Sequence, residues 1–166
     1  MSDVVRESVA AYGATLRRMT VREYYLAAES GVIDPDERLE LLRGEVVETS
    51  PQKSLHAWAT GNLAKVLQRT FPDASIRAQF PLRLDDTNEP EPDVLVALGP
   101  DSRYVGRHPG PADVLLVVEV SDTTLRKDRT LKGPLYAEFG IPEYWILDLN
   151  ASRLEVYRDP GKDGEG

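Results

Sequence analysis

Residues 114–120, VLLVVEV, constrain the fold more than any other part of the sequence. A short run that is almost wholly apolar is typical of a strand covered on both faces, in the middle of a sheet. Glu119 interrupts this run. Burying an ionised carboxylate without a partner costs several kcal/mol or forces the group to take up a proton. The sequence therefore predicts a central strand and, close to it, a group that binds Glu119.

The segments around this strand predict a mixed α/β fold. Thr20 and Glu23 have the spacing of a capping box at a helix start, and Arg43-Gly44 is typical of a hairpin turn. Alternating and β-branched runs mark the strands, and apolar residues at helical spacing mark the helices. The expected order is a helix over 21–30, a hairpin over 38–50, a helix over 54–71, strands over 75–84, 93–98 and 114–120, a helix over 124–139, and strands over 143–149 and 153–157.

One feature interrupts this pattern. Gly133-Pro134 falls inside the predicted helix 124–139. Proline at that position removes a backbone hydrogen bond and clashes with the preceding turn. We therefore expect the helix to kink or restart at Pro134.

Composition limits the class of protein. The chain of 166 residues is long enough for one domain with its own core. We assign 1–18 to an N-terminal arm, 19–158 to a single domain and 159–166 to a disordered, glycine-rich tail. The chain has no cysteine, which excludes disulfides and thiolate metal sites. No apolar stretch has the length of a signal peptide core or a membrane span, so we expect a cytoplasmic protein without membrane contact. The net charge of −8 argues against a non-specific nucleic-acid coat protein.

Two acids on neighbouring predicted strands are the main candidates for chemistry. Asp93 begins the strand 93–98 and Glu119 lies near the end of 114–120, so pairing of these strands would bring both carboxylates to one edge of the sheet. Like charges in one site repel each other unless a proton or a cation lies between them. Oxygen ligands select Mg²⁺, Ca²⁺ or Mn²⁺ over zinc, and the backbone carbonyl of Val120 is a natural third ligand.

Each acid also has an ordinary structural interpretation. Glu119 is consistent with a buried ion pair to a nearby lysine or arginine. Asp93 is consistent with a turn residue that begins a strand after Pro92. The spacing of the residues leaves these alternatives open.

A basic run follows the central strand. The candidates for phosphate contacts are Arg126, Lys127 and Arg129. Lys132 is the candidate for polarising an attacking water or a phosphoryl oxygen. Asp128, Lys132 and Tyr136 share one helix face at four-residue spacing. The ordinary alternative is an Asp128–Lys132 surface pair on a solvated cationic face.

Other acids and histidines carry weaker signals. Glu40, in ELLRGE, is a candidate for a further carboxylate, although a solvent-facing hairpin acid is at least as good an interpretation. His56, near a helix start, is expected to cap or to pack. His108 lies in a glycine- and proline-rich loop and carries no signal.

Several motifs together resemble a known family. PEPD, VVEVS and KDRTLKGPLYAEFGIPEYWILD are similar to motifs of the Uma-type restriction endonuclease family, a bacterial branch of the PD-(D/E)xK nuclease superfamily. The similarity runs from about Glu40 to Asp148. It implies a restriction-endonuclease-like fold, with a central mixed β-sheet flanked by helices and an N-terminal helix and hairpin. It also implies metal ligands at Asp93 and Glu119, and a hairpin glutamate that maps to Glu40.

The position of the superfamily's lysine is different in this chain. That lysine normally stands two residues after the acid, where this sequence has Ser121. The sequence resembles branches in which the lysine has moved to the following helix, which implies Lys132. Family members also tend to continue past the strand that corresponds to 153–157.

These observations lead to one main hypothesis and two alternatives. The main hypothesis is a Mg²⁺- or Mn²⁺-dependent endonuclease that hydrolyses phosphodiester bonds in DNA, as a homodimer because two DNA strands suit two-fold symmetry. The first alternative is a catalytically silent nuclease-fold protein that binds a protein or a nucleic acid, which the acidic charge and Ser121 favour. The second is an enzyme that uses the same metal on a small phosphate ester.

Overall fold

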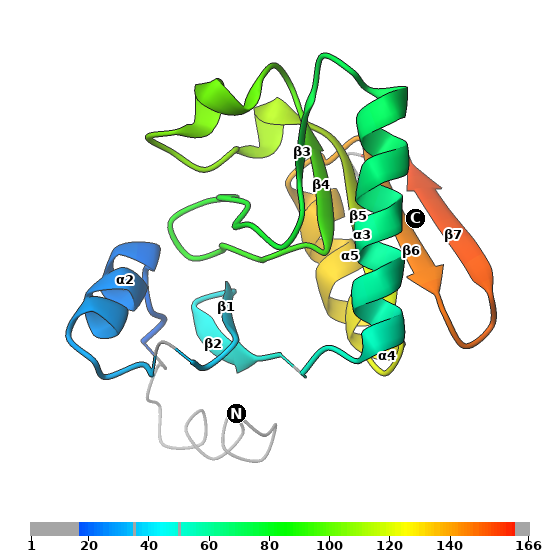
Figure 1. Cartoon of the computed structure of the whole chain (residues 1–166). Helices are drawn as coiled ribbons and strands as arrows, with labels where there is room; N and C mark the ends of the chain where they lie inside the picture. Colours follow the sequence, from blue (N-terminus) through cyan, green and yellow to red (C-terminus); the bar gives the residue numbers. More distant parts are fainter. Residues whose placement is uncertain (1–16, 35, 50, 162–166) are drawn as a thin grey trace.

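The computed structural model describes residues 17–34, 36–49 and 51–161 of the chain. Residues 1–16 and 162–166, which form most of the predicted arm and tail, lie outside this described part. The elements follow the predicted order of helix, hairpin, helix, strands, helix and strands (Figure 1). None of the helices in the described part is long and apolar enough to cross a membrane.

A five-stranded mixed sheet forms the centre of the fold, with the strand order β3-β4-β5-β6-β7. β5 occupies the middle, as its apolar run predicts. It pairs antiparallel with β4 and parallel with β6, and the two outer pairs are antiparallel. The strands are β3 (Ser75–Arg77), β4 (Val94–Ala97), β5 (Val114–Ser121), β6 (Glu143–Asp148) and β7 (Arg153–Arg158).

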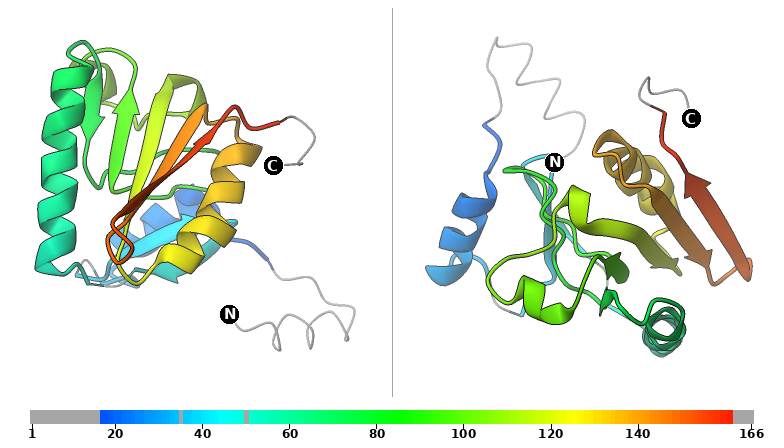
Figure 2. Two further views of the ribbon diagram at one scale, coloured as in Figure 1. Left: turned by 90° about the vertical axis from the view of Figure 1, so that its right-hand side faces the viewer. Right: turned by 90° about the horizontal axis from the view of Figure 1, so that it is seen from above.

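Helices cover both faces of this sheet (Figure 2). On one face, Val118 of β5 packs with Leu67 of the long helix. On the other face, Val117 packs with Leu135 and Tyr136. Successive β5 residues therefore pack into opposite cores, as expected from strand geometry. The predicted central mixed sheet flanked by helices is confirmed. The long helix is α3 (Ser54–Thr70), and the opposite face is covered by α4 (Leu125–Lys127), the π-helical η3 (Asp128–Lys132) and α5 (Gly133–Glu138).

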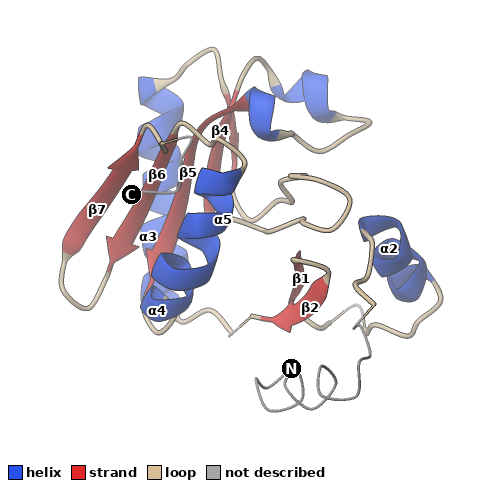
Figure 3. Ribbon diagram, turned by 180° about the vertical axis from the view of Figure 1, so that it is seen from behind, coloured by secondary structure: helices blue, strands red, loops and turns tan. Residues whose placement is uncertain are grey.

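The N-terminal helix and hairpin lie outside the main sheet (Figure 3). α2 (Val21–Glu29) begins at the predicted capping box of Thr20 and Glu23. β1 (Leu39–Leu42) and β2 (Glu45–Glu48) form a separate two-stranded sheet, closed by Arg43 and Gly44, which both have positive φ. The N–H of Glu89 donates to the carbonyl of Leu41 at 2.8 Å, which attaches the hairpin to the segment before β4.

One predicted element differs from the observed one, and a second takes one of its two expected forms. The strand predicted over 75–84 ends at Arg77, because Gln79 has a φ of 58° and turns the chain. The helix predicted to kink or restart at Pro134 restarts there, since α5 begins at Gly133 with the proline in its first turn, directly after the π-helical turn of η3. Since Pro134 has no N–H to donate, the preceding turn widens, and the N–H of Gly133 bonds to the carbonyl of Asp128.

Candidate active site

The register of β4 and β5 brings the two predicted acids to the same end of the sheet. Val94 pairs with Val118. These strands are antiparallel, so Asp93, which precedes Val94, and Glu119, which follows Val118, lie side by side next to this pair. Glu119 is 3% exposed and Asp93 is 9% exposed. Each carboxylate is held by its own set of partners.

A buried lysine binds Glu119. Lys132 Nζ donates to Glu119 Oε1 and to Glu40 Oε1, in both cases at 2.9 Å. The hydroxyl of Tyr136 donates to the same Glu119 oxygen, also at 2.9 Å. Glu40 comes from β1, Lys132 from η3 and Tyr136 from α5, and all of these side chains are buried. The structure therefore brings together Glu119, Lys132 and Glu40, which lie far apart in the sequence.

Asp93 is oriented by neighbouring groups on both of its oxygens. The N–H of Val120 donates to Oδ2 at 2.8 Å. Gln79 Nε2 donates to Oδ1 at 3.2 Å, and His56 Nε2 lies 2.8 Å from the same atom. The N–H and C=O of one strand residue point to the same neighbour, so the Val120 carbonyl also points towards the side of β5 on which Asp93 lies.

Asp128 is buried, in contrast to the exposed Asp128–Lys132 pair of the ordinary interpretation. Its carboxylate accepts hydrogen bonds from the hydroxyls of Ser121 and Thr124, the latter at 2.7 Å. Ser121 stands two residues after Glu119, where the resemblance leads us to expect a lysine. The serine is therefore part of a hydrogen-bond network that anchors η3, the segment that supplies Lys132.

Burial dominates the electrostatics of this cluster. It raises the pKa of the Glu119 carboxyl, an effect that the Lys132 ammonium opposes and that the Asp128 and Asp93 carboxylates reinforce. Burial by itself lowers the pKa of Lys132, but Glu119 and Glu40 outweigh it, and the pKa of the lysine is raised overall. Lys132 is therefore charged at neutral pH.

The predicted phosphate contacts differ in their surroundings. Arg129 donates through Nε to Glu155 of β7 at 2.9 Å. Lys127 Nζ lies 3.7 Å from Glu40 Oε2 and lines the same cavity as the acids. Arg126 is exposed and has no ion-pair partner within the described part of the chain. Of these three residues, Lys127 is the one that the structure places at the cluster.

A small cavity of about 50 Å³ opens onto these groups. Glu40 Oε2 is buried beside it without a hydrogen-bond donor among the described residues. No group of three or more acidic, histidine or cysteine side chains able to hold a metal occurs in 17–34, 36–49 and 51–161. Two carboxylates and a backbone carbonyl instead fit an ion such as Mg²⁺, which binds through one or two carboxylates and keeps several waters. The lining residues are Arg38, Glu40, Thr49, Gln52, His56, Glu91, Asp93, Glu119, Thr124, Lys127, Asp128 and Lys132.

Sequence reasoning missed two partners of Asp93. His56 lies on the face of α3 that also carries the buried Thr60 and Leu67, so its place on the covered face is a usable signal. We expected a residue that caps or packs because a histidine there is more often a packing residue. Gln79 has no such signal, because nothing in its neighbourhood predicts the positive φ that ends β3.

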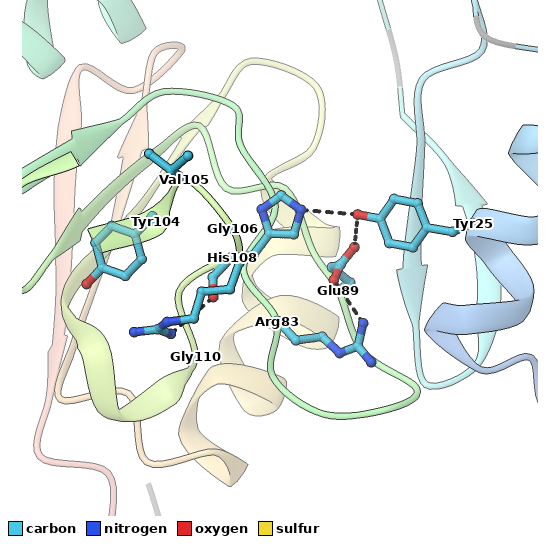
Figure 4. A pocket seen from close by; sticks show the side chains of 9 residues that line it. Tyr25, Arg83, Glu89, Tyr104, Val105, Gly106, His108 and Gly110 are labelled. Atoms are coloured by element: carbon cyan, nitrogen blue, oxygen red, sulfur yellow. Dashed lines mark hydrogen bonds and ion pairs between the residues drawn. The ribbon is translucent and has the colours of Figure 1, made fainter. Parts of the chain in front are cut away.

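A second and larger cavity, of about 570 Å³, lies away from this cluster (Figure 4). The Tyr25 hydroxyl donates to Glu89 at 2.5 Å and lies 3.3 Å from His108 Nε2. Arg83 donates to the other oxygen of Glu89 at 3.3 Å. Burial and the hydrogen bond to Glu89 raise the pKa of Tyr25. Neither Asp93, Glu119 nor Lys132 lines this cavity, so it is not the candidate active site.

The mixed sheet between helices, with an acid–lysine cluster at the end of its central strand, defines a restriction-endonuclease-like nuclease fold. Comparison with known proteins agrees with this class. Residues 22–165 match the Uma2 family, described as "Putative restriction endonuclease", and the chain belongs to this family.

Solved structures show the same fold. The chain is similar to a crystal structure described as a "putative nuclease belonging to DUF820" from Anabaena variabilis, with a TM-score of 0.65 and 14% sequence identity. The similarity covers 87% of this chain and 82% of the other. A comparison with curated proteins gave no match. The family description points to a nuclease, and the structural neighbour shows the same fold.

Proposed function

We propose that this protein is a Mg²⁺- or Mn²⁺-dependent endonuclease that hydrolyses phosphodiester bonds in DNA. The observation that carries the proposal is the contact of Lys132 Nζ with Glu119 Oε1 at 2.9 Å, at the end of the sheet where Asp93 also lies. This arrangement combines ligands for a divalent ion with a cation able to act on a phosphate. The family description supports the same activity.

Each residue of the site has its own role in the proposed hydrolysis. Asp93, Glu119 and the Val120 carbonyl would hold the ion, which when bound activates a water and neutralises charge on the phosphate. His56 orients Asp93 through the contact with its Oδ1. Lys132 donates to the attacking water or to a phosphoryl oxygen, and so stabilises the charge that develops as the bond to the leaving oxygen breaks.

A nuclease assay on supercoiled plasmid and short oligonucleotides, with Mg²⁺ or Mn²⁺, tests the proposal. The parent protein should cleave with either ion and stop when a chelator removes it. Lys132→Ala should lower cleavage by a factor of about 10² or more, the usual effect of removing one preorganised electrostatic group. Lys127→Ala is the matched control and should lose much less. Equal turnover in the parent and Lys132→Ala would contradict the assigned role and make Lys127 the next candidate.

We also infer that the protein is cytoplasmic and that it forms a homodimer. The homodimer is inferred because two copies related by a two-fold axis present one site to each strand of a duplex. Analytical ultracentrifugation with a short duplex measures this directly. A dimer on the duplex is expected, and a protein that cleaves both strands while remaining a monomer would contradict the inference.

The second candidate function is a catalytically silent protein with a nuclease fold. It is favoured by the observation that both predicted metal ligands already have close partners. Glu119 is bound by Lys132, and Asp93 is bound by the Val120 N–H and lies next to His56. Absence of cleavage with both ions, together with no change in melting temperature when either ion is added, would favour this candidate over the first.

A further inference from the structure

One helix has a charge opposite to that of the chain as a whole. Residues 49–72 contain no aspartate or glutamate, although the chain has 28 acidic residues and a net charge of −8. The same segment contains Lys53, Lys65 and Arg69, so its own formal charge is three positive with no negative. Most of it is α3.

The free charges of α3 lie on its solvent face. At 100° per residue, Trp58, Lys65 and Arg69 point to one side, and the buried Thr60 and Leu67 point to the other. Lys65 and Arg69 are exposed, and neither side chain has a hydrogen-bond or ion-pair partner within 17–34, 36–49 and 51–161. By contrast, Arg129 in the basic run after β5 is bound by Glu155.

An exposed aromatic ring accompanies these charges. Trp58, one of the two tryptophans of the chain, is 67% exposed. This exposure is unusual, because tryptophan side chains are on average highly buried. Asn62 Nδ2 donates to the Trp58 carbonyl at 2.8 Å, so the two residues are adjacent on this face. A flat ring next to unpaired cations has the chemistry of a surface that stacks a base and contacts phosphates.

The helix also starts at the candidate active site. His56, in its first turn, lies 2.8 Å from Asp93 Oδ1. With a rise of about 1.5 Å per residue, Lys65 and Arg69 lie roughly 14 and 20 Å further along the helix. At about 3.4 Å per nucleotide, this corresponds to roughly four and six nucleotides from the site. Figure 1 shows α3 running along one face of the sheet from this end to the other.

We propose that the solvent face of α3, formed by Trp58, Asn62, Lys65 and Arg69, binds a nucleic-acid strand and leads it to the acid–lysine cluster. This inference rests on the proposed nuclease function, to which it adds a binding surface. Lys65 and Arg69 contact phosphates, and Trp58 stacks on a base. Stacking and phosphate contacts tolerate any sequence, so this surface sets affinity without selecting a sequence.

Fluorescence of Trp58 reports binding directly. Trp145→Phe removes the other tryptophan and leaves Trp58 as the sole emitter. Addition of single-stranded or duplex DNA should change this emission in a saturable way, and Trp58→Ala should weaken binding by a factor of about ten or more. Emission that stays constant while an independent assay detects bound DNA would overturn the proposal.

Charge reversal tests the phosphate contacts. Lys65→Glu with Arg69→Glu should weaken DNA binding by a factor of about ten or more and reduce the slope of log affinity against log salt by about two. Arg22→Glu, compared with Lys65→Glu alone, is the matched control, because Arg22 is an exposed residue of α2, away from α3. Thermal melts check that all variants are folded. An unchanged salt slope, or a changed oligomeric state with unchanged DNA binding, would overturn the proposal and indicate a protein-binding face.

A small diester separates this inference from the proposed function. Hydrolysis of bis(p-nitrophenyl) phosphate with Mn²⁺ requires the cavity but not the solvent face of α3, so the variants of that face should match the parent while Lys132→Ala is slower. DNA binding through α3 without hydrolysis of any substrate would retain this inference and reject the nuclease. Cleavage of DNA that the α3 variants leave unchanged would retain the nuclease and reject this inference.

Discussion

At the scale of single residues, Lys132 has the most consequential position. It is 2% exposed and donates to two buried carboxylates, those of Glu40 and Glu119. Inside a protein, a charge that loses its partner has no water to replace it. The stability of this cluster therefore depends on the lysine more than on any single hydrogen bond within it.

Lys132→Met should accordingly lower the free energy of unfolding by about 3 to 5 kcal/mol, because it leaves the buried Glu119 without its cation and Glu40 with only the more distant Lys127. Tyr136→Phe is the control. It removes one hydrogen bond to Glu119, and about 1 kcal/mol is expected. Urea unfolding of the parent and both variants gives the comparison. A Lys132→Met protein as stable as the parent would show that the acids do not need the lysine for folding.

How well each residue of the site could be predicted depends on the kind of contact that places it there. Asp93 and Glu119 follow from strand periodicity, because the register of two neighbouring strands fixes both at once. Lys132 followed from family resemblance, since helix spacing alone also allowed an exposed pair with Asp128. His56 and Gln79 depend on how α3 and the turn after β3 pack against β4. Helix spacing places His56 on the covered face of α3, but it does not identify Asp93 as its partner.

At the scale of elements, two glycines illustrate opposite roles. Gly44 closes the β1–β2 hairpin with a φ of 72°, and an added Cβ would meet the Cβ of Arg18 at 2.4 Å. Gly61 lies inside α3, and an added Cβ would meet nothing within 4 Å. The same substitution should therefore have opposite effects on stability at the two positions.

Gly44→Ala should destabilise the protein by more than about 1 kcal/mol, because alanine disfavours the left-handed region and clashes with Arg18. Gly61→Ala should stabilise it by about 0.5 to 1 kcal/mol through helix propensity. Chemical denaturation of each variant measures the difference. Equal effects of one sign at both positions would contradict the assignment.

The loop between β4 and β5 gives a pH dependence. It contains two 3₁₀ turns, η1 (Asp101–Tyr104) and η2 (Pro111–Asp113). Hydrogen bonds from Arg107 outweigh burial and lower the pKa of Asp113 from 3.8 to about 2. A carboxyl whose pKa is lower in the folded state stabilises the protein above its unfolded pKa, and this stabilisation disappears as the pH falls through the folded value.

Asp113→Asn should therefore cost about 2 kcal/mol at pH 7, and the difference from the parent should shrink as the pH falls from about 4 to about 2. Urea unfolding of both proteins across this range is the measurement. A difference that stays constant with pH would show that Asp113 acts through packing and not through its charge.

Among the elements, side-chain spacing predicted where the helices and strands lie better than it predicted where they end. The apolar run of β5 and the capping box of α2 are local signals, and both predictions are confirmed. The end of β3 depends on the positive φ of Gln79, and the π-helical turn depends on how the chain accommodates Pro134. Both arise from the loss or redirection of backbone hydrogen bonds, which side-chain periodicity does not report.

At the scale of the whole molecule, the candidate site joins four parts of the fold. Glu40 comes from the separate hairpin, Asp93 precedes β4, Glu119 belongs to β5 and Lys132 comes from the helical layer. Binding of an ion to groups from separate elements stabilises the folded state as a whole, because the unfolded chain has no such site.

Addition of Mn²⁺ or Mg²⁺ at about 100 times its dissociation constant should stabilise the parent by roughly 2.7 kcal/mol. For a chain of this size, the melting temperature should rise by about 5 to 10 °C. Asp93→Asn and Glu119→Gln should each abolish most of the rise. Asp113→Asn should keep it, because Asp113 lies before the opposite end of β5. Melts in which the ion shifts none of these proteins would exclude Asp93 and Glu119 as ligands.

The pairing of Lys132 with two acids has a further consequence for the proposed binding of an ion. The chain supplies its own counterion, so the fold can form before any metal arrives. Under the proposed function, a divalent ion held by Glu119 would take the place of the Lys132 ammonium group as the positive charge beside that carboxylate. Lys132 would then be free to donate to an anion next to it. The contact that pairs the buried charges of the folded chain would thus also hold a cation in reserve for a phosphate.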